Sequence, residues 1–440
     1  MVAARRADPN PQFAEAFAQA LPSLPGNLVE LRQASLASFE TLGLPTNRAE
    51  LWKYTNLPRF IDQPRVRAAA HKLAAGTVAD HFAGGPKARR LIFINGHLQV
   101  GLSHFGGLPA GVRIEPLDAA LANDGAALTP TLKTQTNERS MTALNAALCD
   151  HGAVIEVDAG VQFADPVQLL FLNETGDAAS MSHPRLIVRL GAGSSMHLIE
   201  SHIALNDGAA LTNIVAHYEI ADDAVLTSDR LQLLKGDGTL VSKLHAELGN
   251  TAKLDLSTVG LGGTLIRNEN EVWIKGSDTD ANLNGIYLPR GTEHVDHLIQ
   301  IHHDAANSRS EQLYKGVMRD RGRAAFQGKI FVHKDAQQTN AYQTNNNLLL
   351  SDDAEIDSKP ELEIYADDVK CSHGATCGDH DEQALFYLRS RGLNAEAAES
   401  VLTFAFLAEV IDRIGDETVR ETAKQAVIDR LPGGDLLRDI

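Results

Sequence analysis

Cysteine and histidine side chains gather in one short segment of the chain, between Cys371 and Cys377. The segment reads Cys-Ser-His-Gly-Ala-Thr-Cys, so His373 lies between the two thiols. Thiolate and imidazole are the ligands that iron–sulfur and zinc sites use. Three such side chains leave a fourth ligand position open, or leave the site to be completed by a second chain. Because C-x-H-x-x-x-C is not an established ligand spacing, the alternative is a strand end whose small residues include cysteine.

A second candidate site lies in the histidine-rich segment 294–304. Alternate side chains of a β-strand share a face, which places His294, Asp296 and His302 on the same side. Two imidazoles and one carboxylate are a known metal-binding set, so these residues predict a mononuclear metalloenzyme as an alternative function. The competing interpretation is a polar ladder on the outside of a coil, with His297 as a hydrogen-bonded inner residue. Strand alternation explains the polar residues without any ligand and favours this second interpretation.

Three consecutive asparagines, Asn345 to Asn347, form a third polar feature. Side-chain amides can form hydrogen bonds from coil to coil in stacked β-structures. We therefore expect a structural ladder here, with a sugar-binding face as the alternative. A β-helical enzyme acting on carbohydrate would also need aromatic platforms, and an aromatic content of 5% weighs against it.

The elements that must position these residues are short strands. Segment 152–370 contains short apolar or alternating runs without a helical period, separated by turn residues. Turn clusters that begin at Gly191, Ala221, Gly249 and Gly276 recur about every 28 residues, an interval typical of stacked repeats. This pattern predicts a mainly β protein built on a β-solenoid. A large β-sandwich is the alternative.

Helical segments flank the predicted solenoid on both sides. We expect an N-terminal helical region over 1–150 with a β-hairpin near 91–100, a β-helix core over 151–378 and a C-terminal helical domain over 379–440. Asp381 and Asn394 are suited to cap two C-terminal helices. The second of these, 395–411, is apolar almost all round, so either its own domain or a partner protein must cover it on more than one side.

Composition and missing motifs exclude several classes of protein. Lys and Arg number 40 against 57 Asp and Glu, and the net charge of −17 disfavours nucleic-acid or anionic-membrane binding. Apolar runs fall short of the roughly 20 residues that a transmembrane helix needs. Segment 1–12 has no apolar run, so we expect no secretory signal and a cytoplasmic location. Phosphate-binding loops, nucleophile-elbow motifs and H-E-x-x-H motifs do not occur.

Three runs, 345–350, 359–376 and 381–392, resemble the SufB/SufD family of iron–sulfur cluster assembly proteins. Pro45 to Glu50, followed by Trp52 to Thr55, is similar to the N-terminal motif of that family, and the resemblance is dense over about 285–415. B-type members carry a glutamate where this chain has Gly374, so Gly374 favours the D type. Cys377 departs from the aliphatic residue expected at its position.

The resemblance implies a right-handed parallel β-helix between helical N- and C-terminal parts. It also implies a non-catalytic scaffold subunit that pairs with a SufB-like subunit through the β-helix. A SufC-like ABC ATPase would bind the C-terminal helical domain, which would account for the absent phosphate-binding loop. A nascent iron–sulfur cluster would be held transiently, with His373 and then Cys371 as the metal ligands. No role for Cys377 follows, and an isolated chain could pair with itself.

Overall fold

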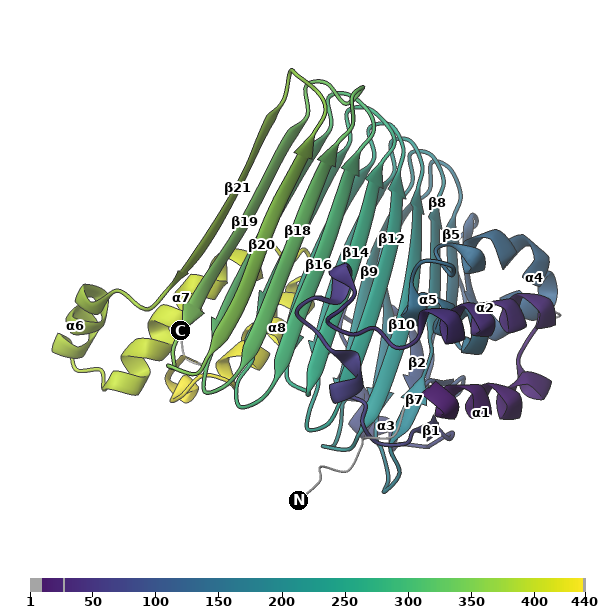
Figure 1. The fold of residues 1–440 in the computed structure, drawn as a ribbon, viewed down its shortest axis with the longest axis horizontal. Helices are drawn as coiled ribbons and strands as arrows, with labels where there is room; N and C mark the ends of the chain where they lie inside the picture. The colour runs from purple at the N-terminus through teal and green to yellow at the C-terminus, as the bar shows by residue number, and fades with distance from the viewer. Residues whose placement is uncertain (1–9, 27, 438–440) are drawn as a thin grey trace.

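The computed structural model of this protein describes residues 10–26 and 28–437. Two long β-sheets face each other and form a parallel β-solenoid (Figure 1). From β5 (Gly152–Val157) onward nearly all successive strands alternate between the sheets, and these strands pair with one another in parallel. The predicted mainly β class and the solenoid are therefore confirmed, and the sandwich alternative is wrong. Residues 1–9, which carry most of the expectation about a secretory signal, lie outside the described residues.

Each sheet has an open edge at the C-terminal end of the solenoid. The first sheet contains, in spatial order, β20 (Glu355–Ile364), β18 (Arg323–Val332), β16 (His294–His303), β14 (Leu265–Ile274), β12 (Thr239–Leu248), β10 (Ala210–Ile220), β8 (Arg185–Leu190), β5 (Gly152–Val157) and β4 (Val112–Pro116). β7 (Ser180–Ser182) also pairs with β10, and β1 (Val66–Arg67) pairs with β7. The second sheet contains β21 (Lys370–Gly378), β19 (Asn340–Leu349), β17 (Arg309–Met318), β15 (Asp280–Tyr287), β13 (Lys253–Leu261), β11 (Val225–Leu233), β9 (Ser195–Ala204), β6 (Gln162–Asn173), β2 (Arg89–Ile94) and β3 (His97–Leu98).

The repeat seen in the sequence is the length of one coil. Strand register pairs Leu211 with Thr239, an offset of 28 positions. One corner of each coil needs a residue with positive φ, such as Asp223. The backbone N–H of this residue forms a hydrogen bond to the next coil, since Asp223 donates to the Asn250 carbonyl at 2.8 Å. Equivalent left-handed corners follow at Thr251, Asp278, Asn307 and Gln338. Turn residues therefore recur because every coil must bend at the same place.

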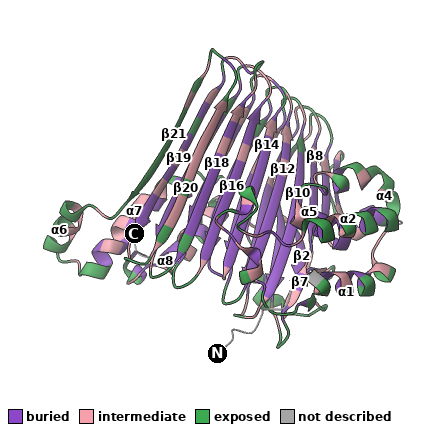
Figure 2. Ribbon diagram, viewed as in Figure 1, coloured by how far each residue is buried: buried purple, intermediate pink, exposed green. Residues whose placement is uncertain are grey.

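Strand alternation places apolar side chains inside the solenoid. Ile214, Ala216 and Tyr218 of β10 belong to one large buried cluster that continues through the other coils. Figure 2 shows the middle strands buried along most of their length, whereas β21 is exposed. Among the described residues no helix is long and apolar enough to cross a membrane.

N-terminal helices cover the early coils. They are α1 (Asn10–Ala20), α2 (Val29–Leu42), α3 (Ala75–Ala79), α4 (Leu117–Lys133) and α5 (Ser140–Leu148), with short 3-10 turns η1 (Leu21–Ser23), η2 (Glu50–Trp52) and η3 (Leu57–Arg59). β2 and β3 form a hairpin around Asn95-Gly96, and β2 also pairs with β6. The solenoid sheets therefore take strands from before residue 151.

Three helices follow the solenoid: α6 (Glu382–Ser390), α7 (Ala395–Ile411) and α8 (Glu417–Ile428), followed by the turn η4 (Gly434–Leu437). α7 and α8 pack back on the second sheet, whereas α6 packs against α7. The predicted caps are confirmed, since Asp381 and Asn394 accept backbone N–H bonds at the starts of α6 and α7. Leu407 and Ile411 of α7 share a buried cluster with Ile286 of the second sheet. The chain itself therefore covers one side of this apolar helix.

Close stacking of the corners predicts a strong effect at Gly276. A Cβ there would lie 2.0 Å from the Asn250 backbone nitrogen of the preceding coil. We expect Gly276→Ala to lower the free energy of unfolding by about 2 kcal/mol, measured from urea denaturation. Gly176→Ala is the control, because a Cβ at Gly176 meets nothing within 4 Å. Equal losses in the two variants would contradict tight corner packing.

Candidate functional site at the open end of the solenoid

Cys371 and His373 lie on β21, the last strand of the second sheet. Register pairs Cys371 with Ala341 and His373 with Gln343, both of which are buried in the interior of the preceding coil. Side chains paired in this way point to the same side of a sheet, so Cys371 and His373 belong to inward-facing rows. Because β21 has a neighbour on one side only, Cys371 is half-buried and His373 is exposed.

The ligand geometry of this strand is incomplete. Cys371 and His373 are two positions apart, about 7 Å along the strand, whereas Cys377 lies about 13 Å beyond His373. Within the described residues no three His, Cys, Asp or Glu side chains are placed to hold a metal ion. Burial raises the pKa of the Cys371 thiol, so a cation or metal is needed to favour the thiolate. This end of the chain can therefore offer two ligands from one strand.

A hydrogen-bonded polar network lies directly behind these residues. Tyr287 donates to Asn347 Oδ1 at 2.7 Å and accepts from Asn345 Nδ2 at 2.8 Å. Asn347 is in register with Cys377, and Thr376 donates to Asn346 Oδ1 at 2.9 Å. The predicted coil-to-coil ladder is thus present at all three asparagines, because Asn345 also donates to the Tyr314 carbonyl at 3.4 Å and Asn347 to the Thr376 carbonyl at 3.3 Å. Sequence patterns gave no sign of the tyrosine that links them.

The alternative site built on His294, Asp296 and His302 does not form. His294 and His302 lie eight positions apart on β16, about 26 Å along one strand. His302 instead stacks between Trp273 and Phe331, with ring centroids at 3.8 and 4.4 Å. The metalloenzyme hypothesis is therefore wrong, because residues that share a face of a strand need not be near one another.

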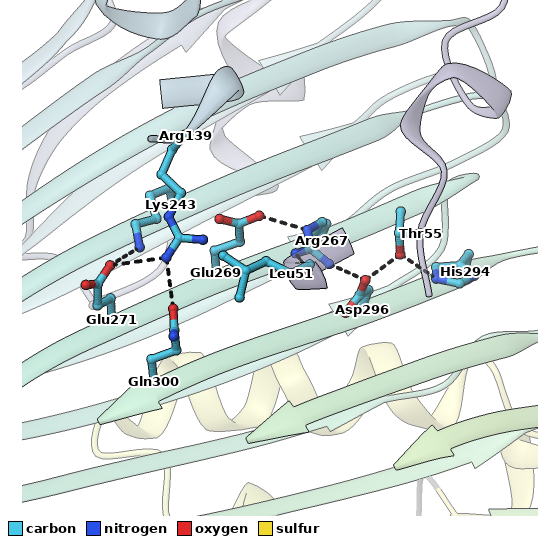
Figure 3. Close-up of polar contacts among 10 residues, drawn as sticks. All are labelled: Leu51, Thr55, Arg139, Lys243, Arg267, Glu269, Glu271, His294, Asp296 and Gln300. Atoms are coloured by element: carbon cyan, nitrogen blue, oxygen red, sulfur yellow. Dashed lines mark hydrogen bonds and ion pairs between the residues drawn. The ribbon is translucent and has the colours of Figure 1, made fainter. Parts of the chain in front are cut away.

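His294 and Asp296 instead anchor the N-terminal segment to the sheet (Figure 3). Thr55 donates its only proton to Asp296, so its oxygen accepts from His294 Nε2 at 3.0 Å. Arg267 forms an ion pair with Asp296 and donates to the Leu51 carbonyl. Burial lowers the pKa of His294, which keeps the imidazole neutral. The polar ladder predicted for the outside of the coil is present, but the N-terminal segment buries this part of it.

His297 points inward, as expected, between the rings of Tyr287 and Tyr314, with centroids 5.3 and 5.0 Å away. Neither ring nitrogen has a hydrogen-bond partner among the described residues, so the prediction of a hydrogen-bonded histidine is wrong. Burial lowers the pKa of His297 to about 4, because a charged imidazole would lose its hydration there.

Comparison with known proteins agrees with the architecture. The model of the SufBD core domain of SUF-system FeS cluster assembly matches residues 171–406, and that of the SufBD protein N-terminal region matches residues 13–169. The chain belongs to the SufBD family. It is 30% identical to the iron–sulfur cluster assembly protein SufD of Escherichia coli over 91% of this chain and 93% of that protein.

Other SufBD relatives extend the similarity across bacteria. An iron–sulfur cluster assembly SufBD family protein of Synechocystis is 30% identical over 91% of this chain and 90% of its own length. SufD of Bacillus subtilis is 31% identical over 65% of this chain and 66% of its own length. The resemblance read from the sequence is therefore confirmed at the level of the family.

Buried neutral histidines predict that this SufBD protein loses stability in acid. The unfolded chain takes up a proton below a pKa of about 6.5, whereas folded His297 stays neutral until about pH 4, so stability falls as the pH falls between these values. Between pH 7.5 and pH 5 this group alone accounts for about 2 kcal/mol of lost unfolding free energy.

His297→Gln should reduce that acid loss by the same amount, measured by urea denaturation at the two pH values. His373→Gln is the matched control, since His373 is exposed. An unchanged acid loss in His297→Gln would show that His297 titrates normally in the folded protein.

Proposed function

We propose that this protein is a D-type scaffold subunit in the assembly of nascent iron–sulfur clusters, and that it is not itself an enzyme. The observation that carries the proposal is the position of His373 and Cys371. Both lie on the inward row of the last strand, at an open edge, in a chain of the SufBD family. The nascent cluster is the cargo of this site, held transiently and not as a resident cofactor.

Neutral imidazole and thiolate differ in how readily they bind iron here. A histidine side chain binds metal through a ring-nitrogen lone pair and is among the ligands of protein-bound iron. The Cys371 thiol must lose a proton that its half-buried position retains. We therefore rank His373 first and Cys371 second. Two ligands do not complete an iron site, so the proposal requires further ligands from another chain.

The open edge suggests how that other chain would join. β20 and β21 each have a sheet neighbour on one side only, so their outer backbone groups are available to pair with another strand. We propose that a SufB-like subunit stacks its own β-helix here, which brings its ligands to His373 and Cys371. A second copy of this chain could occupy the same edge when the protein is isolated.

Removal of His373 provides the direct test. His373→Ala should fold and join its partners, because an exposed edge residue contributes little to the core. It should fail to support cluster formation in cells that lack the native gene and other assembly routes, measured as the activity of iron–sulfur enzymes.

Ser372→Ala is the matched control, since Ser372 is exposed on the opposite face of the same strand. Cys371→Ser should give a smaller defect than His373→Ala. Normal cluster content with His373→Ala would rule out a metal role for this histidine.

The C-terminal helices suggest where a SufC-like ATPase would bind. α7 packs on the solenoid, but α6 has no buried residue and exposes Phe386 by 75% and Tyr387 by 57%. We therefore place the ATPase contact on α6. Deletion of 380–440 would not isolate the contribution of α6 to ATPase binding, because it would also expose the apolar sheet face on which α7 packs.

The double substitution Phe386→Ser with Tyr387→Ser should weaken capture of the purified ATPase at least tenfold, measured by pull-down titration. Val100→Ser is the control, because Val100 is 68% exposed in the N-terminal region. Undiminished capture by the double variant would move the contact away from α6.

A further inference from the structure

A cavity of about 280 Å³ lies between the N-terminal segment and the outer face of the first sheet. Its walls come from segment 42–52, from the start of α5 and from β12 and β14. It is distant in sequence from β21, and the scaffold function proposed above makes no use of it. Its volume lies just below the range of small-molecule sites, which starts at about 300 Å³, so only a small ligand would fit.

Hydrogen-bond donors are in excess at one end of this cavity. Arg139 lines it, and Nε and Nη1 of Arg139 are buried with no hydrogen-bond partner among the described residues. Only Nη2 is engaged, donating to Gln300 at 2.9 Å (Figure 3). Lys243 also lines the cavity and is almost fully buried. Buried donors without acceptors are costly, so an acceptor at this position would stabilise the site.

The nearby acceptors are already engaged. Glu271 Oε2 accepts from Lys243 at 2.6 Å and from Gln135 at 2.6 Å, and lies 3.9 Å from Arg139. Its other oxygen accepts from Trp273 at 3.0 Å. One carboxylate is therefore shared by two cations. Glu269, a buried carboxylate that also lines the cavity, accepts from Arg267 at 2.9 Å.

The rest of the lining restricts the chemistry of a ligand. Apolar walls are formed by Leu42, Pro45, Leu51, Trp52, Met141 and Val241. Three carboxylates line the cavity: Glu138 is exposed, Glu50 is ion-paired with Lys359, and Glu269 is ion-paired with Arg267. Together they disfavour multiply charged anions such as phosphate esters. A ligand suited to this site carries one negative charge at one end and a short apolar body.

We propose that this cavity binds a small monocarboxylate with a short apolar chain, whose oxygens accept from Arg139 and Lys243. The carboxylate occupies the donor-rich end, and the chain lies against Trp52 and Met141. Arg267 is not part of the site, because Asp296 and Glu269 already neutralise it.

Three probes of equal length test the charge requirement: hexanoate, hexylammonium and 1-hexanol. We expect saturable binding of hexanoate to the full chain, measured by saturation-transfer NMR and calorimetry. Hexylammonium and hexanol should bind at least about tenfold more weakly, because neither can accept two charge-assisted hydrogen bonds. Absence of saturable hexanoate binding, or equal binding of all three probes, would overturn the proposal.

Two variants test the location of binding. Arg139→Gln should weaken hexanoate binding at least about tenfold. Ala49→Trp should block it by filling the mouth of the cavity, and Ala49 is exposed, so the fold tolerates the change. Arg48→Gln is the control, because Arg48 is exposed on the same segment and does not line the cavity. Hexanoate binding that survives Ala49→Trp would place it elsewhere and contradict the proposal.

Discussion

In-register stacking of parallel coils is the constraint on which the rest of this structure depends. Each inward residue lies beside the residue at the same position of the next coil, so neighbours along the axis must share the available space. Gly285 is paired with Tyr314, and Tyr287 with Gly316. A Cβ on Gly316 would lie 2.1 Å from the Tyr287 ring. At these four positions large and small residues alternate along the strand and between coils, so each coil restricts the residues that the next coil can use.

The same rule explains why the C-terminal end of the solenoid is chemically distinctive. On every solenoid strand before the last of its sheet, an inward polar group has a coil on both sides, as Asn345 and Asn347 of β19 have between β17 and β21. On β21 the inward row has one neighbouring coil and an open side, so His373 remains accessible although it follows a buried row. Stacking thus aligns the candidate ligands, and the end of the solenoid exposes them.

Local and periodic features could be predicted from the sequence, and contacts between distant segments could not. Turn clusters about 28 residues apart predicted the length of the coil, and Asp381 and Asn394 predicted where two helices begin. Each of these signals lies within a few residues of the turn or helix that it predicts. Strand alternation correctly predicted that His297 points inward. It could not predict that the ring has no hydrogen-bond partner among the described residues. The failure at His302 has a different cause, since alternation specifies a face and says nothing about distance along it. The contact of Thr55 with Asp296 had no local signal.

That contact has a consequence for the order in which the protein is made. Thr55 and Asp296 are separated by 241 positions, and Lys359 of β20 bonds Glu50 from still further along the chain. Trp52 and Leu57 of the N-terminal segment are buried in the finished protein. At about 5–20 residues per second, the ribosome needs roughly 10–50 s to make the coils that cover them. During that interval the apolar residues of the N-terminal segment have no sheet to pack against. They are then exposed to chaperones that bind apolar segments of nascent chains.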